Sequence, residues 1–298
     1  MHWIVATIIA AFFQNLRSSL QKSLNDQMSL MASTYVRFVF ALPFSALLFF
    51  GYFRDLNVVS DALSNHTFLG YVVLGSLSQI IFTFIFLYSF KFSNFVVGTT
   101  LSKTEVIQIA FLELIILNDH LSGIVILGII ISTIGVIIFS VKDLNFFLKN
   151  ILSKSTLLGI FCGSLLALSI VSFRGATLSL ENLTSNFEMA ITTLFASTFV
   201  QTILVSCYLI TKERDQFKNI LNNKYKSVAA GFSGFIATLF WFYAFSLTQA
   251  SMVRAFGQIE LFFSYLSSRY YFKEKIKLIE IIGITVFVIG ILVILVTK

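Results

Sequence analysis

A lysine and a glutamate stand two residues apart inside a segment that is otherwise mostly apolar. The segment is TTLSKTEVIQIAF, residues 99–111, and it carries Lys103, Glu105 and Gln108. An ionised side chain within a bilayer costs several kcal/mol unless it faces a water-filled cavity or a partner of opposite charge. A carboxylate held there can bind a cationic group or carry a proton. The spacing therefore indicates a site for a charged solute inside a membrane.

A second segment of the same kind lies far along the chain. QASMVRAFGQIELFF, residues 249–263, places Arg254 one helical turn before Gln258, so that both side chains share a helix face, and Glu260 follows. Glu105 and Glu260 each lie about eleven residues into a predicted helix, near the middle of a bilayer. We expect these glutamates to contact substrate or to carry a coupling proton. The alternative is a structural ion pair, for example between Glu105 and an arginine, that locks helices together.

Basic and aromatic residues in other apolar segments complete the candidate site. Arg17 and Arg37 could instead anchor membrane ends. The aromatic run FIATLFWFYAF, residues 235–245, could stack on a flat or cationic substrate, although helix and lipid packing is the competing interpretation. The predicted substrate-binding residues are Arg17, Arg37, Lys103, Glu105, Gln108, Arg174, Trp241, Tyr243, Arg254, Gln258 and Glu260.

The composition predicts an all-α integral membrane protein. Hydrophobic residues make up 57% of the chain and charged residues 12%, and there are 35 phenylalanines and one proline. A helix needs about 20 apolar residues to cross a bilayer. We expect ten transmembrane helices, near residues 3–22, 30–50, 68–90, 95–117, 122–141, 156–177, 188–211, 227–247, 250–271 and 278–297.

Ten spans leave no room for a soluble catalytic domain. The three histidines, His2, His66 and His120, stand at or near the ends of predicted helices, and no HExxH or Ser-His-Asp grouping occurs. We therefore expect no enzyme activity, no catalytic residues, no metal site and no cofactor.

The net charge of +7 is explained by orientation in the membrane. Lys and Arg gather in the loops that follow the first, third, fifth, seventh and ninth predicted helices. Because cytoplasmic loops collect basic residues, this bias predicts that both termini lie outside. No nucleic-acid partner is expected.

The second half of the chain repeats the first at a shift of 155 residues. The equivalent positions are Glu105 and Glu260, Asp119 and Glu274, Gly128 and Gly283, and Gly135 and Gly290. We expect two five-helix repeats, residues 1–150 and 151–298, and an odd number of spans per repeat makes the second inverted relative to the first. The paired glycines predict helices that approach closely, and this packing is a candidate contact between the repeats.

Residues 89–139 and their counterpart, residues 246–293, resemble the sequence pattern of a known protein family. The chain resembles the EamA-type members of the drug/metabolite transporter superfamily, with Arg37 similar to the family's second-helix arginine and Lys91 to the basic residue after the third helix. The resemblance implies ten helices in two inverted halves, helices 5 and 10 packed apart from the transport core, and termini inside, against the charge bias. A proline that often follows the family's glutamates is replaced here by Val106 and Leu261.

Together these features predict a secondary active transporter in the inner (cytoplasmic) membrane. We expect alternating access, proton coupling and a small zwitterionic or amphoteric solute such as an amino acid. The expected partners are this solute, the lipid bilayer and coupling protons, and a monomer suffices. One alternative is an exchanger of phosphorylated anions, since the basic residues within the spans outnumber the two glutamates. Another is a membrane sensor or scaffold that transports nothing.

Overall fold

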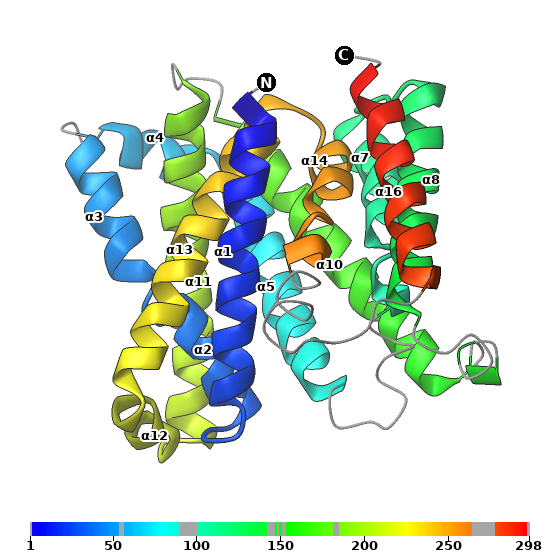
Figure 1. Ribbon diagram of the computed structural model, residues 1–298. Helices are drawn as coiled ribbons and strands as arrows, with labels where there is room; N and C mark the ends of the chain where they lie inside the picture. The colour runs from blue at the N-terminus through cyan, green and yellow to red at the C-terminus, as the bar shows by residue number, and fades with distance from the viewer. Residues whose placement is uncertain are drawn as a thin grey trace. The chain divides into compact units, whose positions relative to one another are not determined.

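The computed structural model describes residues 2–53, 57–89, 100–141, 147, 149–150, 153–180, 185–263 and 278–296. Every regular element in these ranges is a helix (Figure 1). The chain divides into two compact units, Met1–Phe84 with Ser172–Thr248, and Ile85–Val171 with Gln249–Lys298. Each unit therefore combines segments from the first and second halves of the sequence.

The first unit is built around a buried apolar core. Its complete helices are α1 (His2–Leu24), α2 (Leu30–Val39), α3 (Leu42–Tyr52), α4 (Asn57–Ser64), α11 (Asn186–Lys212), α12 (Gln216–Asn222) and α13 (Lys224–Leu247). Helix α1 packs along α13, and α11 packs against α2, α3 and α13 (Figure 1). Helices α5 (His66–Ser89) and α10 (Lys154–Leu178) are each divided between the two units.

The predicted helix at 30–50 is split in two. Helix α2 ends at Val39, and α3 begins at Leu42 with Pro43 in its first turn. Proline has no N–H to bond the carbonyl four residues earlier, that of Val39, and its ring clashes with that carbonyl, which explains the break after Val39. At the break the Phe40 backbone packs so closely on Gly231 of α13 that a Cβ at position 231 would clash with it.

The second unit contains α7 (Glu105–Leu117), α8 (Gly123–Ser140), α14 (Ala250–Gly257) and α16 (Leu278–Val296). Helices α8 and α16 run side by side (Figure 1). Gly128 meets Gly290 and Gly135 meets Gly283, and a Cβ on any of the four would strike the backbone of the other helix. The prediction that the paired glycines allow close helix packing is confirmed, because only glycine lets two backbones approach this far.

The predicted helix at 95–117 is interrupted just before Glu105. Residues 103–104 form a turn rather than helix. The Lys103 N–H donates to the Thr100 carbonyl at 3.2 Å and the Thr104 N–H to the Leu101 carbonyl at 3.1 Å. Bonds that reach back three residues instead of four tighten the helix.

The predicted helix at 250–271 is interrupted at the equivalent place, just before Glu260. The Gln258 N–H donates to the Ala255 carbonyl at 3.3 Å and the Ile259 N–H to the Phe256 carbonyl at 3.1 Å. Each of these residues lies 155 positions after its counterpart in the first repeat. The same break therefore occurs in both repeats, and it forms without the proline that the resemblance implied.

Eight helices in the described ranges are long and apolar enough to cross a membrane. They match all the predicted segments except 95–117 and 250–271. Helices α2 and α3 together count as one of the eight, Leu30–Tyr52. The predicted count of ten continuous helices is therefore not confirmed, because these two segments are broken where they are described. The connections between these spans contain two short helices, α4 and α12.

Candidate functional site

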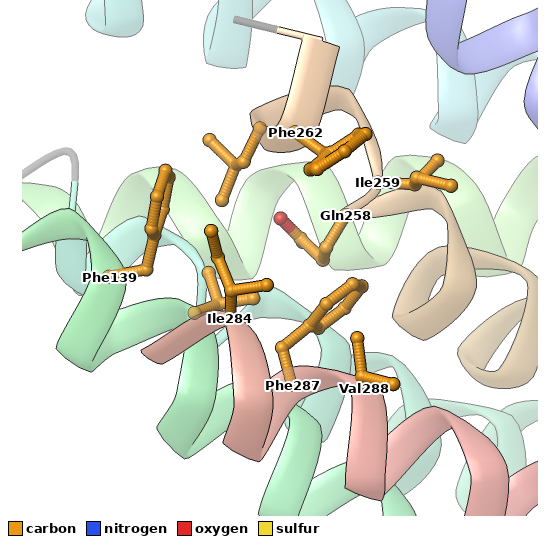
Figure 2. Close-up of a pocket in the computed structure, with 9 residues that line it drawn as sticks. Phe139, Gln258, Ile259, Phe262, Ile284, Phe287 and Val288 are labelled. Atoms are coloured by element: carbon orange, nitrogen blue, oxygen red, sulfur yellow. The ribbon is translucent and has the colours of Figure 1, made fainter. Parts of the chain in front are cut away.

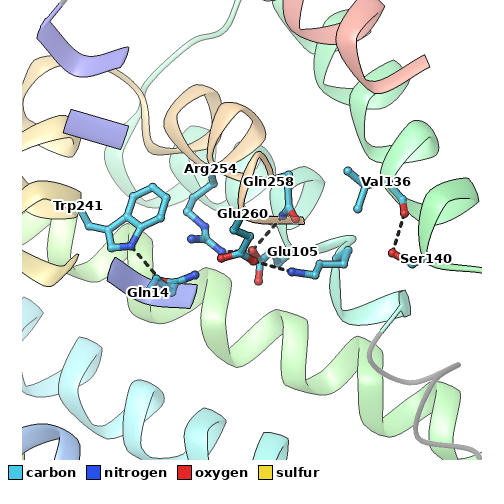
Figure 3. Close-up of polar contacts among 9 residues, drawn as sticks. Gln14, Glu105, Val136, Ser140, Trp241, Arg254, Gln258 and Glu260 are labelled. Atoms are coloured by element: carbon cyan, nitrogen blue, oxygen red, sulfur yellow. Dashed lines mark hydrogen bonds and ion pairs between the residues drawn. The ribbon is translucent and has the colours of Figure 1, made fainter. Parts of the chain in front are cut away.

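Glu105 and Arg254 form a buried ion pair in the second unit. Glu105 is the first residue of α7, and Arg254 lies in the last turn of α14. The guanidinium donates to Glu105 Oε1, and the two side chains are 3% and 6% exposed (Figure 3). Charge-assisted hydrogen bonds of this kind are among the strongest in proteins. The ion pair with an arginine, which was the alternative interpretation of Glu105, is thus formed with Arg254.

A second ion pair joins Lys103 to Glu260. Lys103 Nζ lies 2.8 Å from Glu260 Oε1, and the side chains are 21% and 14% exposed. Glu260 also lies within electrostatic range of Arg254. Two cations and two carboxylates are thus gathered in one cluster with no formal net charge, and the Lys103–Glu260 pair is its more accessible part.

The contacts within the cluster join equivalent positions of the two repeats. Gln258, the counterpart of Lys103, directs its Nε2 to Glu105 Oε1 at 3.4 Å (Figure 3). Lys103 donates to Glu260, the counterpart of Glu105. Each repeat thus supplies a side chain to the glutamate of the other repeat. The helix breaks at 103–104 and 258–259 position these donors directly before the glutamates.

A buried carboxylate that the sequence prediction missed holds α14 in place. Both oxygens of Glu113, on α7, accept from the N–H groups of Ala250 and Ser251 at the start of α14. Asp119 accepts from the Gln249 side chain at 2.9 Å. The first helical N–H groups have no partner within their helix, and a negative charge stabilises that end. The signal in the sequence was a further glutamate two helical turns after Glu105.

Gln108, an uncharged amide, lies close to the helix break that precedes Glu105. Its Nε2 donates to Thr104 Oγ1 at 3.2 Å. A Cβ built on Gly163 of α10 would lie 3.3 Å from the same Nε2 and 3.0 Å from the Ser102 carbonyl. The Gln108 side chain therefore contacts α10 within the second unit.

Arg17 and Arg37 come together in the first unit. Both side chains are buried, and both border Gly234 of α13, whose ideal Cβ would lie 3.3 Å from Arg17 Cδ and 3.6 Å from Arg37 Cγ. Arg37 donates to Thr83 Oγ1 at 3.4 Å. The sequence placed these arginines in separate helices, and the structure brings two like charges to one place.

Arg174 caps the end of a helix. Its Nη1 donates to the carbonyls of Phe245 and Thr248, which lie at the C-terminal end of α13. These carbonyls have no partner within the helix, and a cation stabilises them. The described contacts thus give Arg174 a structural role.

Trp241 and Tyr243 lie in aromatic contacts of the first unit. Trp241 is buried, stacks on Phe245 with ring centroids 5.9 Å apart, and donates to Gln14 Oε1 at 2.9 Å (Figure 3). Tyr243 meets Phe187 edge to face at 5.8 Å. These contacts fit the packing interpretation of the aromatic run. Lys91, which the resemblance singled out, and Glu274, the repeat counterpart of Asp119, lie outside the described residues.

The comparisons with known proteins agree with this architecture. A solved structure titled "Crystal structure of protein" covers 99% of this chain and 96% of its own, with a TM-score of 0.68 and 12% sequence identity, so it shares the fold. No curated protein matches the chain. The family model described as "EamA-like transporter family" matches residues 1–141 and again residues 157–296. The chain is therefore a multi-pass membrane protein with two repeats, and it belongs to the EamA-like transporter family.

Proposed function

We propose that the chain is a secondary transporter of a small zwitterionic or amphoteric metabolite, such as an amino acid, and that it works by alternating access. The observation that supports this substrate class is the neutral cluster of Lys103, Glu105, Arg254 and Glu260. Inverted repeats with broken helices are a common architecture of secondary transporters, and substrate groups bind at the breaks. Here both breaks adjoin the cluster.

Charge balance favours a zwitterion over a singly charged solute. Separating a buried ion pair leaves two uncompensated charges, each of which costs several kcal/mol. A zwitterion supplies an amine to Glu260 and a carboxylate to Lys103, so both charges stay paired when the internal pair opens. A simple cation or anion satisfies only one of them and leaves the other unpaired.

The two ion pairs take different roles in this proposal. Lys103–Glu260 is the more exposed pair and exchanges its partners with the substrate. Glu105–Arg254 is nearly inaccessible and keeps the cluster in position. The other proposed substrate contacts in the same unit are Gln108 and Gln258.

Proton coupling is assigned to Glu260. A proton on this carboxylate removes the charge that attracts both Lys103 and a substrate amine, so proton and substrate compete for one site. Such competition couples their movements in opposite directions.

The proposed location is the inner membrane, with a monomer as the working unit.

The test uses the full chain reconstituted in proteoliposomes. Counterflow of zwitterionic, cationic and anionic solutes is measured with and without an imposed pH gradient, for the native chain, Glu260→Gln and Glu105→Gln. Glu280→Gln, at the start of α16, is the control for loss of a carboxylate elsewhere. We expect the native chain to prefer zwitterions and Glu260→Gln to lose the response to the pH gradient. Unchanged flux and pH dependence in both cluster variants would refute the proposal.

A second candidate function, exchange of phosphorylated anions, is favoured by the two buried arginines beside Gly234. Guanidinium groups bind phosphate oxygens in a bidentate manner. Preferential counterflow of phosphorylated solutes without proton movement, lost in Arg37→Gln, would favour this function. A sensor or scaffold role has no support from the family, whose members are transporters.

A further inference from the structure

A small apolar pocket lies within the second unit, between α8, α16 and the segment after α14 (Figure 2). Its volume is about 210 Å³. Of the residues that line it, only Gln258 has a polar side chain, and the Gln258 Oε1 is inaccessible. The pocket therefore offers hydrocarbon contacts alone. Outside the charge cluster, exposed groups that could select a charged ligand gather on the first unit.

The connection between α11 and α13 carries a dense group of basic side chains. Two acidic residues, Glu213 and Asp215, lie within the same stretch. None of the basic residues forms an ion pair with a carboxylate in the described ranges, so their positive charge is not compensated there. This group is named the basic surface, and its five exposed members are Lys212, Arg214, Lys218, Lys224 and Lys226.

One of the two carboxylates is directed to other partners. Glu213 accepts hydrogen bonds from Ser29 Oγ, directly before α2, and from Tyr208 Oη at 3.5 Å. These bonds hold its carboxylate oxygens toward hydroxyl groups instead of toward the lysines. The basic side chains therefore remain available to an anion from outside the protein.

The buried side of α12 fixes the basic surface to the first unit. Ile220 is buried, and Phe217 meets Tyr35 edge to face with ring centroids 6.0 Å apart. The Gln216 Oε1 accepts from the Ser29 N–H at 2.9 Å. The stretch is thus a packed segment with a defined backbone, and a surface that is already ordered loses less conformational entropy when it binds a partner.

The basic surface lies where two membrane spans end. Helices α11 and α13 are both long and apolar enough to cross a membrane, and Figure 1 shows α12 at the end that joins them. Two apolar side chains stand among the cations, since Leu221 is 67% and Tyr225 is 83% exposed. The Lys224 Nζ lies 5.3 Å from the centroid of the Tyr225 ring. Tyrosine is enriched at membrane–water interfaces, where its ring contacts lipid and its hydroxyl contacts water.

We propose that the basic surface binds the headgroups of anionic phospholipids. The lysines and Arg214 pair with phosphate oxygens, while Leu221 and Tyr225 contact the first carbons of the acyl chains. Clusters of about 4–8 basic residues next to a membrane span are typical of this recognition. The proposal goes beyond the transport function and does not depend on it, because lipid binding is measured without transport.

The test measures lipid binding to the purified full chain in a neutral detergent by native mass spectrometry. The probes are phosphatidylglycerol and phosphatidylcholine with identical acyl chains, and soluble glycerol phosphate as a competitor. The surface variant combines Lys224→Gln and Lys226→Gln. The control variant combines Lys149→Gln and Lys154→Gln, two exposed lysines of another connection, and it removes the same number of charges.

We expect the native chain to bind phosphatidylglycerol about tenfold more tightly than phosphatidylcholine. Each basic residue near an anionic lipid strengthens binding about fivefold, so the surface variant should lose roughly tenfold or more in affinity for phosphatidylglycerol, and the control variant should not. Higher salt should weaken phosphatidylglycerol binding alone, a measurement that needs no variant. Leu221→Ser combined with Tyr225→Ser should weaken both lipids equally, because the acyl contact does not depend on the headgroup.

Three results would overturn the proposal. Equal binding of both lipids by the native chain would show that the surface does not recognise charge. An equal loss in the surface and control variants would show a general attraction by net charge instead of a site. Full competition by glycerol phosphate at the affinity of the lipid would show a site for free phosphate compounds instead of a lipid surface.

Discussion

Lys103 and Gln258 occupy equivalent positions in the two repeats, yet only one of them is charged. Each side chain reaches the glutamate of the other repeat. Glu105 has Arg254 as well, so an uncharged amide suffices beside it, whereas Lys103 supplies the ion pair of Glu260. The unmatched lysine is therefore the residue of the cluster that we expect to select the solute.

The substitution Lys103→Gln makes the two repeats alike and tests this role. We expect affinity for zwitterionic and anionic solutes to fall about tenfold, as for loss of one charge-assisted contact, while cationic solutes compete better than before. Competition in proteoliposome counterflow measures both effects. Lys154→Gln, an exposed lysine at the start of α10, is the control. An equal loss of flux for every solute would contradict a role in selection.

At the scale of helices, α14 depends on a carboxylate of another helix. Glu113 of α7 accepts from the N–H groups of Ala250 and Ser251, so it fixes the end of α14 from which Arg254 follows one turn later. We expect Glu113→Ala to lower the free energy of unfolding by roughly 1–3 kcal/mol, because two buried donors lose their acceptor. Thermal unfolding of the purified protein measures this. Glu113→Gln keeps one acceptor oxygen and should cost less; equal stability of the native chain and Glu113→Ala would contradict the assignment.

The contact between α8 and α16 rests on glycine at both sides. A Cβ at position 290 would strike the Ser132 backbone, which cannot move as a flexible side chain could. Gly290→Ala should therefore destabilise the protein by about 1–3 kcal/mol through overpacking. Gly70→Ala is the matched control, because nothing lies within 4 Å of its ideal Cβ. The two thermal unfolding midpoints should differ clearly, and similar midpoints would show that the helices can separate without cost.

At the scale of the whole molecule, the side of the membrane on which the chain ends follows from its loops. Lys and Arg are in excess in the loops that follow the first, third, fifth, seventh and ninth predicted transmembrane helices. This excess predicts that both termini lie outside. A C-terminal alkaline phosphatase fusion should therefore be active, and a fusion after Lys212, at the end of α11, should be inactive. The opposite pattern would show that the chain adopts the orientation that the resemblance implies.

Much of the fold could be predicted because its causes are local. Membrane helices follow from runs of apolar residues, and the eight candidate spans match predicted segments, although Leu30–Tyr52 is divided between α2 and α3. The glycines of the α8–α16 contact could be found because they recur at matched positions in both repeats. The interruptions before Glu105 and Glu260 were not predicted, since no proline or glycine adjoins residues 103–104, and Gly257, directly before 258–259, has no glycine counterpart at position 102.

The sequence by itself determined which residues are charged within the membrane and that Glu105 and Glu260 are equivalent. Only the tertiary structure decided their partners, because Lys103 and Glu260 are separated by 157 positions and an ion pair depends on helix faces meeting in space. It also showed that Arg174 and Glu113 cap helix ends, a use that residue type alone does not distinguish from substrate binding. A charge in a membrane must find a partner, but the packing of the helices determines which one.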